Sequence, residues 1–201
     1  MKHRILAIRY FLGSCALSLA LGLVSFAQQA APPQGQPPAQ TPPKEYPTAR
    51  IEGLVKEWTR ARDYTKEYLD AMPEDGYAFR PTPDIRSFAE QMLHLSAAHF
   101  QFATRVFGTT NPYQGKNPEK MDELKSKAAC TKFVMEGYDY VLSGLKGMSE
   151  AKLDERMAVQ GYNRPKVQLL GAAFEHQTHH RGQTTIYLRL KGVTPPAEKL
   201  F

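Results

Sequence analysis

The sequence predicts an all-α protein whose folded part is a four-helix bundle. Apolar residues recur at three- and four-residue steps in four long stretches, which is the period of amphipathic helices. The connections between these stretches are too helical or too rich in proline for strands. A chain of 201 residues with 42% hydrophobic content can build one core, so we expect one antiparallel bundle over residues 48–201.

The first 27 residues have the pattern of a signal peptide. Basic residues, among them Lys2 and Arg4, precede an apolar run over residues 16–26, and a small-x-small cleavage site ends at Ala27. The run is shorter than the roughly 20 residues that a membrane-spanning helix needs. We therefore expect cleavage after Ala27 or nearby, export to the periplasm or the medium, and no stable membrane insertion afterwards.

The two cysteines suggest an alternative form of export and limit the chemistry of the mature protein. The residues that end at Cys15 resemble a lipidation site, but most of the apolar stretch follows Cys15 instead of preceding it, so lipid anchoring is the less favoured interpretation. Cleavage leaves Cys130 alone, which excludes an internal disulfide and thiolate ligation of a metal.

A linker and the first helix come next. Residues 28–47 are rich in Pro, Gln and Ala and predict a disordered spacer with no core of its own. Apolar residues from Ile51 to Leu69 then predict a helix that starts near Arg50 and ends before Pro73. Residues 77–83 combine aromatics with two prolines, which predicts a loop packed onto the bundle.

The second helix has a clear start signal. Ser87 and Glu90 form a capping box, in which each side chain accepts a hydrogen bond from a free backbone N–H group. We expect this helix to run to about Phe107, before Gly108.

Two more helices complete the expected bundle. Asn117 can cap a third helix over residues 119–145, with Pro118 at its first position. A helical turn near residues 149–153 and a segment ending at Pro165 then lead to a last helix over residues 167–190, which Gly192 ends.

The last helix carries a pair of histidines that suits a metal ion. His176 and His180 are four residues apart, so both side chains lie on one helix face. Neutral imidazoles bind zinc, nickel, copper or ferrous iron at about 2.0–2.2 Å. His179 is an alternative partner for His176, because a three-residue step also keeps two side chains adjacent.

His94 is the candidate third ligand. It lies between apolar residues on the second helix, so it should face the interior, where an imidazole needs a partner. Alone it would be read as a core histidine, but the pair on the last helix favours ligation. His99 lies off this face and is expected to be a surface or packing residue, and Glu90 is assigned to the capping box in preference to supporting His94.

Several of these segments together resemble the DinB/YfiT family. The resemblance rests on residues 87–97 around His94, on HQTHHRGQ at 176–183, on YLRLKGVTPP at 187–196 and on the Tyr-x-Phe-Arg-Pro loop at 77–81. It covers about residues 50–196. It implies an up-down-down-up bundle, a three-histidine metal centre at His94, His176 and His180, and homodimers.

The resemblance also bears on function. It makes Arg181 and Gln183 structural, and it suggests thiol transfer, because family members include thiol transferases and a thiol-dependent isomerase. Three protein ligands leave a coordination position open, which also makes metal-dependent hydrolysis of a small molecule available. A non-catalytic metal-binding or stress-related module is the third interpretation. We expect one divalent ion, zinc or nickel before iron or manganese, and the sequence names no catalytic residue.

Other function classes lack support. The net charge of +6 is modest and partly comes from the signal peptide, so we expect no nucleic-acid partner. The sequence has no Gly-rich phosphate loop, no Gly-x-Ser-x-Gly elbow and no Cys-x-x-Cys motif.

Overall fold

The computed structural model of the protein describes residues 49–200. The expected signal peptide, Cys15 and the linker at 28–47 lie outside the described residues. Within residues 49–200, no helix combines the length and the apolar character that crossing a membrane requires.

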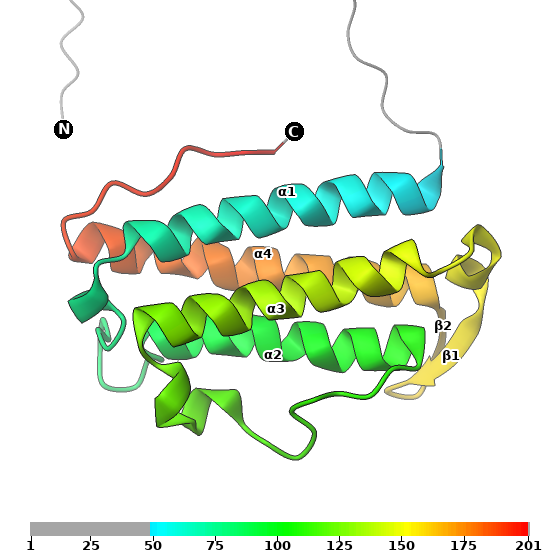
Figure 1. The fold of residues 1–201 in the computed structure, drawn as a ribbon, viewed down its shortest axis with the longest axis horizontal. Helices are drawn as coiled ribbons and strands as arrows, with labels where there is room; N and C mark the ends of the chain where they lie inside the picture. Colours follow the sequence, from blue (N-terminus) through cyan, green and yellow to red (C-terminus); the bar gives the residue numbers. More distant parts are fainter. Residues whose placement is uncertain (1–48, 201) are drawn as a thin grey trace, which may run out of the picture. The chain divides into compact units, whose positions relative to one another are not determined.

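The described residues form the predicted bundle of four long helices (Figure 1). These helices are α1 (Arg50–Ala71), α2 (Phe88–Phe107), α3 (Lys127–Lys146) and α4 (Lys166–Leu190). α2 packs against α3 and α4, and α1 packs against the same two helices. α1 and α4 run in one direction and α2 and α3 in the other, so the expected up-down-down-up order is confirmed.

Large aromatic side chains fill the space between the helices. Trp58 from α1, Phe88 and Phe100 from α2, and Phe133 and Tyr138 from α3 are all almost completely buried. Burying side chains of this size supplies most of the folding free energy, at roughly 25 cal/mol per Å² of apolar surface.

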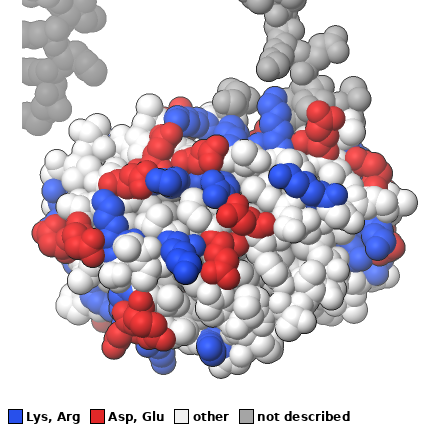
Figure 2. Space-filling view, in the orientation of Figure 1, with Lys and Arg blue, Asp and Glu red and all other residues white. Residues whose placement is uncertain are grey.

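Charged side chains cover the outside of α1. Acidic and basic groups are interspersed on the face seen in Figure 2. Arg62 pairs with Asp139 of α3 at 2.7 Å, and Lys66 pairs with Asp70 at 2.6 Å. Pairs this exposed contribute about 0–1 kcal/mol each, so the interior, and not this surface, stabilises the bundle.

The capping signals that the sequence gives are present. Ser87 and Glu90 form both hydrogen bonds of the capping box at the start of α2, and Gly108 ends that helix with φ of 73°. α1 ends at Ala71, before Pro73, and leads into the short 3₁₀ helix η1 (Glu74–Gly76). The expected helical turn near residue 150 is η4 (Glu150–Asp154).

The predicted start of the third helix was wrong. Asn117 does cap a helix, but this is the 3₁₀ helix η2 (Pro118–Lys120), which is followed by η3 (Asp122–Leu124). Met121 is extended between them and interrupts the helical path. Ser126 supplies a second cap by accepting a hydrogen bond from Ala129, so α3 starts only at Lys127.

The expectation that no strands occur was also wrong. β1 (Arg156–Val159) and β2 (Tyr162–Pro165) pair as an antiparallel hairpin before α4. Gln160 and Gly161 at its turn both have positive φ, 49° and 79°, as a tight two-residue hairpin turn requires. Pro165 is tolerated because β2 is an edge strand of a two-stranded hairpin, where a missing N–H need not break a ladder.

Candidate metal centre

Three histidines from two adjacent helices converge in the groove between α2 and α4. His94 comes from α2, and His176 and His180 come from α4. Their ring centroids are 4.4–5.2 Å apart, and one ring nitrogen of each lies within 4.8 Å of those of the other two. The structure thus brings together the three residues that the sequence singles out.

Helix geometry explains this convergence. His176 and His180 are one turn apart on α4, so their rings share a face, at 4.4 Å between centroids. His94 lies seven residues after the Ser87 cap and faces α4 across the groove, with its ring 4.6 Å from that of His180. The capping box at Ser87 therefore fixes where α2 starts and so where His94 lies.

A carboxylate from a distant segment holds His94. Glu119 of η2 accepts a hydrogen bond from His94 Nδ1 at 2.7 Å, and its other oxygen lies 2.6 Å from Nε of Arg86. Burial acts to raise the pKa of Glu119, but the hydrogen bonds from Arg86 and His94 outweigh it and lower that pKa below its usual value. Glu119 is therefore an anion that fixes the tautomer of His94 and leaves Nε2 free.

An amide pair holds His180 in the same way. The side-chain amide of Gln91 lies 3.1 Å from His180 Nδ1 and also hydrogen bonds the side chain of Gln183. The nitrogen and oxygen of an amide are assigned from their surroundings. With both amides turned over, the Gln91 oxygen accepts from Nδ1–H of His180 and from the Gln183 amide N–H, and this leaves Nε2 of His180 unprotonated.

His176 has no such partner. Its Nδ1 is buried and makes no hydrogen bond to any of residues 49–200. Burial, with the neighbouring His94, lowers the pKa of His176 to about 4, and burial with His176 lowers that of His180 to about 3. Both imidazoles are therefore neutral at pH 7, the state in which they can bind a metal.

This donor set fits one divalent ion. In a tetrahedral zinc site with bonds of about 2.1 Å, ligand nitrogens are about 3.4 Å apart. The three nitrogens, within 4.8 Å of one another, can therefore close onto one ion when rotation of the rings moves each nitrogen by about 1 Å. His176 has a buried nitrogen without a hydrogen-bond partner within residues 49–200, which suits a metal ligand. The rings of His94 and His180 are held in place by Glu119 and Gln91, which suits ligation as well.

Two cavities flank the three histidines. One, of about 320 Å³, is lined by His94 and His176 together with η2. The other, of about 710 Å³, is lined by Gln91, Gln183 and Glu119, which hold the histidines, and by the loop before α2. A small molecule can therefore approach the centre from the groove.

The remaining candidates lie elsewhere. His179 is exposed and 3.0 Å from the side chain of Gln183, outside the cluster. His99 is fully buried against Trp58 and Tyr138, so its assignment to packing was right and the surface alternative was wrong. Glu90 serves the capping box and pairs with Arg80, as the preferred assignment expects.

Sequence reasoning missed Glu119 and Gln91. Glu119 was placed in a regular third helix, where nothing marked it as a partner of His94. Gln91 is three residues before His94, a spacing at which helix neighbours meet, but its actual contact is with His180 on another helix. Neither pairing has a local sequence signal.

Comparisons with known proteins agree with this fold. The family model described as the DinB family matches residues 46–200. YjoA of Bacillus subtilis (strain 168) is 26% identical over 145 residues, which cover 70% of this chain and 90% of YjoA.

Two crystal structures resemble the chain. A DinB-like protein from Bacillus cereus ATCC 10987 has a TM-score of 0.64 at 20% identity, covering 74% of this chain and 97% of its own. The structure of YjoA from B. subtilis has a TM-score of 0.58 at 23% identity, covering 74% and 96%. Both comparisons concern the fold.

Proposed function

The chain belongs to the DinB family, and we propose that it binds one divalent metal ion through His94, His176 and His180. The observation that carries the proposal is the approach of three ring nitrogens to within 4.8 Å of one another in a groove that adjoins two cavities. Three neutral imidazoles favour zinc or nickel, with iron or manganese as alternatives.

The proposed activity is metal-dependent hydrolysis of a small molecule. Structural zinc sites are closed by four protein ligands, whereas three ligands beside an accessible groove are typical of catalytic sites. A bound ion would supply Lewis-acid activation of a water molecule or a substrate. Glu119 and Gln91 orient the rings of His94 and His180, and the two cavities admit the substrate.

Thiol transfer and a non-catalytic role are the alternatives. A metal ion held by the same three ligands would lower the pKa of a bound thiol as well as that of water, so the site alone does not choose between water and a thiol. If the protein only binds metal, the ion should be saturated by ligands and should turn over neither kind of substrate.

Export and dimerisation belong to the same proposal. The signal-peptide pattern ending at Ala27 supports export, which N-terminal sequencing of the protein from its natural host will test. Ile85, Ile186 and Leu190 are 43–59% exposed, and this apolar surface supports a homodimer. Ile186→Glu should convert the dimer to a monomer in light scattering.

The direct test is metal content. We expect elemental mass spectrometry of the protein from Gln28 onward to find about one ion per chain, and His176→Ala or His180→Ala to abolish it. His179→Ala is the matched control on the same helix and should keep its metal. If His179→Ala loses its metal and His180→Ala keeps it, His179 and not His180 is the third ligand. If His176→Ala keeps its metal, the three-histidine centre is rejected. Loaded protein is then screened against ester, amide and thiol-acceptor substrates.

A further inference from the structure

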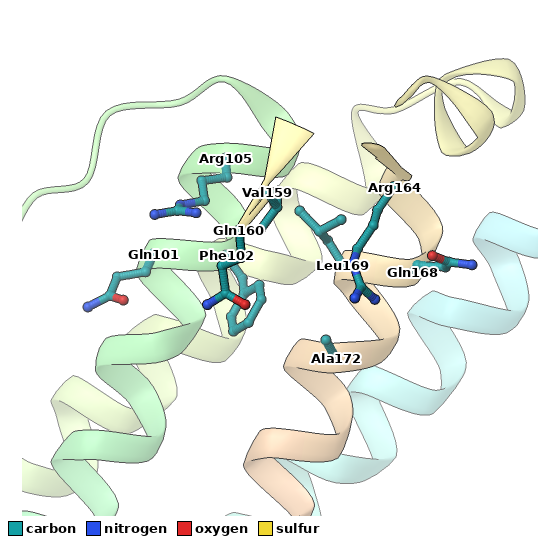
Figure 3. Close-up of a pocket in the computed structure, with 9 residues that line it drawn as sticks. All are labelled: Gln101, Phe102, Arg105, Val159, Gln160, Arg164, Gln168, Leu169 and Ala172. Carbon is teal, nitrogen blue, oxygen red and sulfur yellow. The ribbon is translucent and has the colours of Figure 1, made fainter. Parts of the chain in front are cut away.

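A third cavity lies in the same groove, beyond the histidines. It measures about 300 Å³ and lies between α2, the start of α4 and the β1–β2 hairpin (Figure 3). Four apolar side chains line it, those of Phe102, Val159, Leu169 and Ala172. The polar side chains that line it are those of Gln101, Arg105, Gln160, Arg164 and Gln168. The cavity therefore combines an apolar body with amides and guanidinium groups, and no acidic residue lines it.

Arg164 gives this cavity its positive charge. Its side chain extends from β2 into the space beside α4 and points toward Ala172 (Figure 3). Arg164 is exposed and forms no ion pair within residues 49–200, and its guanidinium carbon lies 4.9 Å from the centroid of the Tyr162 ring. A guanidinium with no carboxylate partner, facing a cavity, is suited to bind a carboxylate or phosphate of a ligand.

The N-terminus of α4 adds to the positive electrostatic potential in this cavity. α4 has no side-chain cap and no acidic residue in its first turn. Within residues 49–200, only its first N–H group, that of Lys166, has a partner before the helix, the carbonyl of Glu155 at 2.9 Å, so much of the partial positive charge of its N-terminus remains. Gln168 and Leu169 in that region line the cavity. Arg105, by contrast, points away from Arg164 and is accounted for by its place in the last turn of α2, where cations are favoured.

The cavity continues to the histidines. Gln101 and Phe102 line both this cavity and the one bounded by His94 and His176. Gln168 and His176 are eight residues apart on α4, which corresponds to about 12 Å along the helix axis. One extended ligand can therefore reach from Arg164 to the three histidines.

We infer that the substrate is an elongated organic anion whose carboxylate or phosphate binds Arg164 while its reacting group lies at His94, His176 and His180. This inference rests on the proposed metal centre and adds the class of its substrate. The anionic end sits roughly 6–12 Å from the reacting end, the rise along α4 from Ala172 or Gln168 to His176, and the chain between them passes over the apolar side chain of Phe102. Inorganic anions and short acids are too small to occupy both ends.

The test uses a series of bifunctional probes on the metal-loaded protein. Each probe is a linear alkyl hydroxamate, which chelates the metal, with a carboxylate at the far end. The matched probes carry a methyl ester in its place. Titration calorimetry should show affinity rising to a maximum at a chain length that spans roughly 6–12 Å. At that length the carboxylate should bind about 10- to 100-fold more tightly than the ester, the range for a charge-assisted hydrogen bond.

Arg164→Gln should remove the advantage of the carboxylate and leave the affinity of the ester unchanged. Arg156→Gln is the matched control, because Arg156 lies on the same hairpin and, within residues 49–200, its side chain donates to the backbone carbonyl of Asn163. It should retain the full advantage. The inference is overturned if the carboxylate and ester probes bind equally at every length, or if Arg164→Gln weakens both alike.

A separate arm distinguishes failure of the metal centre from failure of the anion site. If the protein holds no metal, hydroxamates will not bind, and the cavity is tested with 4-phenylbutyrate instead. Wild-type protein should then show NMR shift changes in residues 157–169 that Arg164→Gln lacks. Absence of these changes in the wild type would reject the anion site whatever the state of the histidines.

Discussion

Glu119 Oε1 lies 2.7 Å from His94 Nδ1, although the second half of α2 and the loop over residues 108–117 separate the two residues in the chain. The contact depends on η2, whose cap at Asn117 places Glu119 over the groove. Metal-bound imidazoles usually donate their second N–H group to such a carboxylate, which raises the basicity of the ligand and fixes its ring. Glu119 is therefore a positioning residue for the candidate centre.

Glu119→Gln should weaken metal binding about 10- to 100-fold, the range seen when such supporting partners are lost. The amide can still accept the hydrogen bond from His94, but it lacks the charge that strengthens it. Competition with a chromophoric chelator measures the dissociation constant.

Glu123→Gln is the control for this experiment, because Glu123 is an exposed carboxylate on the neighbouring η3. It should leave metal affinity unchanged. An equal effect of the two substitutions would mean that Glu119 acts only through the general charge of this segment.

The sequence could predict the histidine cluster because its signals are local. His176 and His180 share a helix face by their spacing alone, and the capping box at Ser87 sets the phase of α2 and therefore of His94. The bundle could be predicted for the same reason, since the helical period and the caps act over a few residues.

The supporting residues and the hairpin could not be predicted in this way. The contact of Glu119 with His94 and that of Gln91 with His180 join separate segments, and their geometry depends on tertiary packing. The hairpin turns at Gln160-Gly161 instead of the usual Asn-Gly or Asp-Gly, and the Pro165 that ends β2 suggests a break. The anion cavity is consequently invisible until the fold is known.

Acid should destabilise the protein through His99. Burial lowers the pKa of His99 to about 3, whereas an unfolded histidine titrates near 6.5. The unfolded state therefore binds more protons than the folded state as pH falls below about 6.5, and stability is lost from there down toward the folded pKa. The loss from this one group is about 2 kcal/mol between pH 7 and pH 5.

His99→Phe keeps an aromatic ring between Trp58 and Tyr138 but cannot be protonated. Urea unfolding at pH 7 and pH 5 should show that the variant loses about 2 kcal/mol less than the wild type over this interval. His176 and His180 titrate in both proteins, so the difference isolates His99. Equal losses would show that His99 is not buried in its neutral form.

Gly137→Ala should destabilise the bundle even though alanine is the better helix former. A Cβ at Gly137 would lie 2.1 Å from Oγ of Ser96, because α2 and α3 approach closely there. We expect a loss of about 1–3 kcal/mol in the free energy of unfolding. Gly171→Ala in α4 is the control, since its Cβ would meet nothing within 4 Å, and it should stabilise by about 0.5–1 kcal/mol. Stabilisation by both substitutions would contradict the close packing of α2 on α3.

Arg181 should stabilise the bundle without contributing to metal binding. Its guanidinium is buried, donates to Gln177 at 2.9 Å and lies over the ring of Tyr64, 4.4 Å from the centroid. It forms no ion pair within residues 49–200, so neutral oxygens and a π face accommodate its charge. A lysine ammonium cannot make the same planar contacts, so Arg181→Lys should cost about 1–3 kcal/mol in urea unfolding.

The matched substitution for this last test is Arg189→Lys, at an exposed position on the same helix, which should change stability by less than about 0.5 kcal/mol. Metal content should stay at one ion per chain in both variants, because Arg181 contacts α1 and lies away from the groove. If Arg181→Lys keeps its stability but loses its metal, Arg181 instead holds the neighbouring His180 in place. The buried guanidinium would then belong to the metal centre and not to the core.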